Sequence, residues 1–210
     1  MFSILSYTFF QYALLGALLS SLLCACVGSY VVTRRLVIAG GGMAHASLGG
    51  VGMGAFFGFS PLLGAAAFAL VGGLGIDWLS RRRDVRSDSA VAMVWTLGMS
   101  IGILFAYLAR GFMTDLPTYL FGDILSISRT DLQVMGLLTA GTLLFFFAFE
   151  RHIVTVAYDP DFAHTQGLAT RAFETALTLI TALTIVGCLR MVGIILVVSL
   201  LSMPQLTAGL

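Results

Sequence analysis

A run of 41 residues, Leu36 to Ile76, contains no Asp, Glu, Lys or Arg. One bilayer crossing needs roughly 20 apolar residues, so this run is long enough for two. The whole chain agrees, because 59% of its residues are hydrophobic and only 10% are charged, whereas a typical soluble domain has about 25% charged residues. The sequence therefore predicts an all-α fold, a polytopic bundle of transmembrane helices, and excludes a water-soluble domain.

Charge-free stretches divide the chain into six or seven predicted spans. A Gly-Phe-Ser-Pro turn signal at 58–61 separates the two spans within the long run. The predicted spans cover residues 2–33, the two halves of 36–76, 89–109, 132–149, about 172–189, and 191–210. We expect them to form a single transmembrane domain over residues 1–210.

The basic residues are all arginines, and their distribution predicts the orientation of the chain. Cytoplasmic loops retain an excess of Lys and Arg. If the N-terminus is outside, eight arginines lie on the cytoplasmic side: Arg34, Arg35, Arg81, Arg82, Arg83, Arg86, Arg151 and Arg171. Three lie on the outer side: Arg110, Arg129 and Arg190. We therefore expect the N-terminus outside and the linker between residues 150 and 171 in the cytoplasm.

Residues 157–167 of that linker, AYDPDFAHTQG, predict a short capped helix. Asp159 is a suitable N-cap, and Pro160 favours the first helical position. Gly167 is suited to end the helix. A helix of about two turns between two spans is well placed to contact a cytosolic partner, and a solvated connecting loop is the alternative.

Five stretches in one order carry a resemblance to a known family. They are GGGMAHASLGGVGMG (40–54), SDSAVAMVWTLGMSIGIL (87–104), LPTYLFGDILSISRTDL (116–132), AYDPDFAHTQGL (157–168) and ALTIVGCLRMVGIILVVSLLSMPQLTA (182–208). Together they resemble the membrane-spanning permease subunit of ABC-type zinc, manganese and iron importers. The resemblance implies a multi-pass protein of a prokaryotic cell (inner) membrane, with about eight spans. It also implies that the C-terminal end of the domain is missing here.

The resemblance further implies partners and site residues. Two permease copies form a homodimer, an ABC ATPase binds from the cytoplasm, and an extracytoplasmic metal-binding protein delivers a divalent metal as substrate. In the family, the segment similar to residues 157–167 is a coupling helix that docks on the ATPase. That role falls on Asp159, Pro160, Asp161, Phe162, Ala163 and Gly167.

The expected translocation residues lie in the second span. Family members usually carry an Asp four residues before His45, but this chain has Gly41 there. An Asp–His pair at that spacing shares one helix face, whereas a single His is a weak metal ligand. His45 is therefore either a metal-contacting residue of the pathway or a packed, hydrogen-bonded interfacial histidine. Gly50 and Gly54 have a small-xxx-small spacing, which fits either helix packing or an unwound segment lining the pathway.

Several classes of site are missing from the sequence. The chain has no lysine and no P-loop motif, so ATP has to be hydrolysed on a partner subunit. It lacks G-x-S-x-G and H-E-x-x-H, so we expect a transport subunit, not an enzyme, and no cofactor bound by this chain. A net charge of +1 predicts no nucleic-acid partner. Cys24, Cys26 and Cys188 lie in apolar runs and are interpreted as buried small residues.

The leading hypothesis is thus an importer permease that works by alternating access, driven by a separate ATPase. Two other classes stay open. A self-sufficient secondary transporter or channel needs ionisable groups near the membrane midplane, and His45 is the one candidate that the sequence offers. A membrane fragment that stabilises another protein, without transporting anything, is the third possibility.

Overall fold

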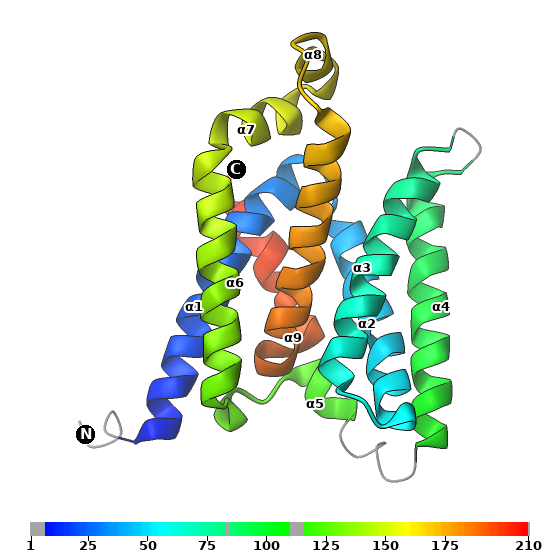
Figure 1. Cartoon of the computed structure of the whole chain (residues 1–210), viewed down its shortest axis with the longest axis vertical. Helices are drawn as coiled ribbons and strands as arrows, with labels where there is room; N and C mark the ends of the chain where they lie inside the picture. The colour runs from blue at the N-terminus through cyan, green and yellow to red at the C-terminus, as the bar shows by residue number, and fades with distance from the viewer. Residues whose placement is uncertain (1–6, 83–84, 110–115, 210) are drawn as a thin grey trace.

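A computed structural model describes residues 7–82, 85–109 and 116–209 (Figure 1). These residues form helices and short connections, with no strand among them. The helices are α1 (Thr8–Thr33), α2 (Val37–Phe57), α3 (Pro61–Ser80), α4 (Ser87–Leu108), α5 (Leu116–Phe121), the 3-10 helix η3 (Ile124–Ser126), α6 (Arg129–Ala148), α7 (Glu150–Tyr158), α8 (Pro160–Thr165) and α9 (Thr170–Ala208). The predicted all-α bundle is confirmed.

The long helices lie side by side along the long axis of the molecule (Figure 1). α2 packs between α3 and α4, and α9 packs against α1 and α3. Five described helices are long and apolar enough to cross a membrane: α1, α3, α4, α6 and α9. α2 has a similar length but is rich in glycine, and most of its residues are buried in the bundle. The multi-pass architecture follows from these helices.

Glycines allow α2 and α3 to approach each other closely. A Cβ atom added to Gly50 would overlap the carbonyl group of Gly64, and one added to Gly64 would overlap the carbonyl of Gly50. A Cβ on Gly54 would lie 2.8 Å from the Cα of Pro61. Small residues permit such backbone contacts between membrane helices. Helix packing is thus an observed role of Gly50 and Gly54, and a role in the pathway stays a prediction.

The last two predicted spans both lie in α9, which is broken at Gly193. This residue has φ 77° and ψ 163°, outside the helical region. Before Gly193 the chain descends from α8, and after it the chain turns back beside α1 (Figure 1). Gly28 of α1 accordingly contacts Leu201 and Gln205. The boundary between the two segments is therefore Gly193, not the predicted position near Arg190.

The two ends of the bundle differ in charge. One end, called the arginine-rich end below, holds the loops after α1 and α3 together with α7 and α8 (Figure 1). Its described arginines are Arg34, Arg35, Arg81, Arg82, Arg86, Arg151 and Arg171. Arg129 and Arg190 lie at the opposite end, and Arg83 and Arg110 lie outside the described residues. Most of the described arginines thus lie at one end, as expected if that end holds the cytoplasmic loops. Which end faces the cytoplasm stays a prediction.

Candidate functional site

The predicted short helix is α8, and its two caps are the predicted ones. The Asp159 carboxylate accepts a hydrogen bond of 2.9 Å from the backbone N–H of Phe162, and Pro160 occupies the first turn. At the other end Gly167 adopts φ 78°, and the N–H of Leu168 donates to the carbonyl of Ala163 at 3.1 Å. A left-handed residue with this bond is a common helix stop. The segment is therefore a fixed helix, not an irregular loop.

α8 forms the outermost tip of the arginine-rich end (Figure 1). It packs against α7 and the start of α9. Ala163 is fully buried in this contact, whereas the Phe162 side chain is 52% exposed. An exposed phenylalanine on a protruding helix is suited to bind a partner, since aromatic residues are enriched where proteins bind each other; its role in docking stays a prediction.

α7 packs against α8. The sequence predicted one short helix in this linker and did not distinguish α7 from α8. α7 lies across the arginine-rich end, nearly perpendicular to α6 (Figure 1). Its Ile153 and Val156 side chains are buried, and Val154 and Tyr158 are exposed. The alternation of buried and exposed positions at helical spacing is the signal that would have revealed an amphipathic helix here.

His45 lies in the middle of α2 and faces α4. Its ring stacks on the Trp95 ring, with centroids 4.4 Å apart and planes 3° apart. The Nδ1 atom is buried and has no hydrogen-bond partner among the described residues. The histidine is therefore packed by stacking, and it retains a nitrogen that no described group uses. Which of its two predicted roles applies stays a prediction.

Gly41, one turn before His45, lies beside open space. Gly41 is buried, yet a Cβ added to it would meet no atom within 4 Å. The described residues contain no group of three or more His, Cys, Asp and Glu side chains that could hold a metal ion. His45 is thus not part of a group of three or more potential metal ligands among the described residues.

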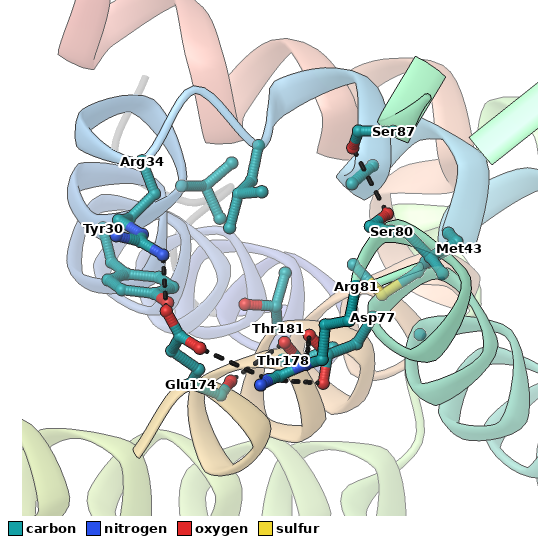
Figure 2. Close-up of a pocket in the computed structure, with 15 residues that line it drawn as sticks. Tyr30, Arg34, Met43, Asp77, Ser80, Arg81, Ser87, Glu174, Thr178 and Thr181 are labelled. Carbon is teal, nitrogen blue, oxygen red and sulfur yellow. Dashed lines mark hydrogen bonds and ion pairs between the residues drawn. The ribbon is translucent and has the colours of Figure 1, made fainter. Parts of the chain in front are cut away.

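A pocket of about 270 Å³ lies at the arginine-rich end, between α1, α2, α3 and α9. Figure 2 shows charged side chains around it. Arg34 Nη2 lies 2.6 Å from Glu174 Oε1, and Arg81 Nη2 lies 3.3 Å from Glu174 Oε2. Arg81 also forms two hydrogen bonds with Asp77, at 3.0 and 2.9 Å. The hydrogen bond to Asp77 raises the pKa of Arg81, so this guanidinium stays charged.

Sequence reasoning missed this group of ion pairs. Sequence patterns could not pair residues that are 140 positions apart, as Arg34 and Glu174 are. At the opposite end, Arg190 similarly pairs with Asp131 at 3.1 Å. The three cysteines are free thiols, with Cys24 and Cys188 buried and Cys26 partly buried.

Comparison with known proteins agrees with this architecture. Residues 6–210 match the ABC 3 transport family. The chain belongs to this family. An uncharacterized membrane protein of Synechocystis is 39% identical over 98% of this chain and 73% of its own length.

The names of two further relatives state which metal they transport. A manganese transport system membrane protein of Halalkalibacterium halodurans is 33% identical over 84% of this chain and 61% of its own length. A high-affinity zinc uptake system membrane protein of Haemophilus influenzae is 30% identical over 93% of this chain and 75% of its own length. The chain thus spans between three-fifths and three-quarters of these relatives. The family assignment and the names of these relatives confirm the prediction that this chain is a membrane transport subunit and not itself an enzyme.

A solved structure shows the same fold. The structure of PsaBC from Streptococcus pneumoniae in complex with Fab matches 97% of this chain and 73% of its own chain, with a TM-score of 0.85 and 27% identity. The resemblance to an ABC metal-importer permease is therefore confirmed, and with it the multi-pass membrane location.

Proposed function

We propose that this chain is the permease subunit of an ABC importer that moves manganese, zinc or iron across a prokaryotic cell membrane. The family assignment and the names of the manganese and zinc relatives support a divalent metal as substrate. The fold shared with PsaBC supports the same type of assembly. In this account the arginine-rich end faces the cytoplasm and the N-terminus lies outside.

The observation that carries the proposal is α8, a capped helix at the tip of the arginine-rich end with Phe162 exposed. We propose that α8 is the coupling helix, docked on an ABC ATPase that hydrolyses ATP. Asp159, Pro160 and Gly167 fix its ends, Ala163 anchors it to the domain, and Phe162 with Asp161 contacts the ATPase. Closure of the ATPase pair then displaces α8 and drives alternating access of the helices.

The remaining partners follow from the same assembly. Two copies of the chain form a homodimer around the pathway, and an extracytoplasmic metal-binding protein delivers the metal to the opposite end, where α5 and η3 lie. His45 contacts the passing metal through its free nitrogen, and the open space at Gly41 belongs to the same pathway. With one imidazole as ligand, the metal is bound weakly and released readily.

Reconstitution of the permease with its ATPase and binding protein tests this function. We expect Phe162→Ala and Asp161→Arg to lower transport-coupled ATP hydrolysis on the order of tenfold, because docking anchors typically contribute about 2 kcal/mol or more. Leu137→Ala is the control, since Leu137 is 78% exposed in the middle of α6, away from both proposed docking ends. Unchanged hydrolysis in both α8 variants would show that α8 is not the coupling helix. Transport that persists without the ATPase would indicate a secondary transporter or channel.

A further inference from the structure

The helices at the arginine-rich end are connected by one chain of ion pairs. Glu174 is the central member, because its two carboxylate oxygens contact Arg34 after α1 and Arg81 after α3. Asp77 of α3 holds Arg81 from the other side through two hydrogen bonds. We call these four residues the Glu174 network. Figure 2 shows them among the residues that line the pocket of about 270 Å³.

The position of Glu174 along the chain gives this network a mechanical consequence. α9 begins at Thr170, directly after Gly167 ends α8, so Glu174 lies in the second turn of the helix that follows α8. Arg34 also donates a hydrogen bond of 3.3 Å to the carbonyl of Val156 in α7. The helices on either side of α8 are therefore both tied to α1 through Arg34, and α9 is also tied to α3 through Arg81.

The network is partly shielded from solvent and its geometry is specific. The Arg34 and Glu174 side chains are 22% and 20% exposed. Isolated, fully exposed ion pairs contribute little, whereas networks with several good contacts hold a defined geometry. Only a short connection separates α8, which ends at Thr165, from α9, which begins at Thr170. A displacement of α8 is therefore passed to the first turns of α9, where Glu174 contacts the two arginines.

We propose that Glu174, with Arg34 and Arg81, is a positioning latch that transmits displacement of α8 to α1 and α3 and so opens the pathway at this end. The inference rests on the proposed role of α8 as the coupling helix. In the closed latch the four side chains join α1, α3 and α9 around the pocket. Movement of α8 and the first turns of α9 separates Glu174 from one arginine, and the pocket widens toward the cytoplasm.

The test compares transport and ATP hydrolysis in the complete reconstituted transporter. Glu174→Gln removes the charge and keeps the shape, Glu174→Asp keeps the charge, and Arg81→Gln breaks the link to α3. We expect Glu174→Gln and Arg81→Gln to retain ATP hydrolysis while the number of metal ions moved per ATP falls about tenfold, within the usual range of coupling effects. Glu174→Asp should move more metal ions per ATP than Glu174→Gln does.

Arg82→Gln is the matched control. Arg82 follows Arg81 directly, but its guanidinium lies 3.9 Å over the exposed Trp78 ring and forms no ion pair with another described residue. Its ratio of transport to hydrolysis should equal that of the unmodified protein. Equal numbers of metal ions moved per ATP in Arg82→Gln, Glu174→Gln and Arg81→Gln would overturn the latch. A parallel loss of ATP hydrolysis and transport would also overturn it, because it indicates a merely structural role. Failure of the unmodified complex to couple transport to ATP contradicts the proposed function instead.

Discussion

Gly41 and His45 are the two residues of α2 for which a role in the metal pathway is proposed. A carboxylate and an imidazole four residues apart share one face of a helix, and here the carboxylate position is glycine. The structure adds that the space beside Gly41 is open and that one nitrogen of His45 has no described partner. The absence of the Asp could be read from the sequence, but the open space could not, because it depends on how other helices pack around α2.

This geometry predicts the effect of Gly41→Asp. The new carboxylate has room and completes a two-ligand site with His45, so Mn²⁺ or Zn²⁺ should raise the melting temperature of the purified variant, since a ligand that binds only the folded state stabilises it. Gly40→Asp is the control, because Gly40 has the same open surroundings but points away from the face of His45. A metal-induced shift of the same size in both variants, or one that survives His45→Ala in the Gly41→Asp background, would contradict the prediction.

Among the elements, α8 and α9 show what sequence can and cannot determine. The caps of α8 were predictable because Asp159, Pro160 and Gly167 act on their immediate neighbours. The break in α9 was placed near Arg190 instead of Gly193, because Gly193 is defined by a distant contact. A Cβ on Gly193 would meet the backbone of α5, and a Cβ on Gly122 would meet the backbone around Gly193. No local signal encodes that pairing.

The contact predicts that Gly193→Ala destabilises the domain. Its combination of positive φ and extended ψ is nearly restricted to glycine and costs a residue with a side chain about 1–3 kcal/mol, and overlap with the α5 backbone adds about 1–3 kcal/mol. Thermal unfolding of the purified protein measures the loss. Gly141→Ala in α6 is the control, because its Cβ meets nothing within 4 Å and alanine favours helices. Equal melting temperatures for the two variants would refute the role of Gly193.

At the scale of the whole molecule, the sequence predicted the bundle and the side of each loop. A bilayer leaves few alternatives to helices, because backbone groups in lipid have to be satisfied within the segment. Charge-free stretches therefore predicted the positions of most of the helices, and the arginines predicted which helix ends lie at the same end of the bundle. What the sequence could not predict are the contacts between distant segments, such as the Glu174 network, whereas the amphipathic helix α7 carried a signal that was missed.

The proposed orientation predicts which introduced cysteines react in intact cells. Ser126→Cys in η3 should be labelled by a membrane-impermeant maleimide from outside, and Thr165→Cys in α8 should be labelled only after the membrane is opened. Both residues are exposed at opposite ends of the bundle. Cys24 and Cys188 are buried and Cys26 is partly buried, so the unmodified protein measures the background labelling. The reverse pattern would place α8 outside and exclude docking on a cytoplasmic ATPase.

Photo-crosslinking from α8 tests the central claim most directly. Phe162 is replaced by benzoylphenylalanine in the membrane-embedded transporter, and Leu125 at the opposite end is replaced in the same way as the control, since both side chains are exposed. The account predicts a light-dependent crosslink between position 162 and the ATPase subunit, and no crosslink between position 125 and the ATPase subunit. An assembled complex that gives no crosslink at position 162, or an equal one at position 125, would contradict it.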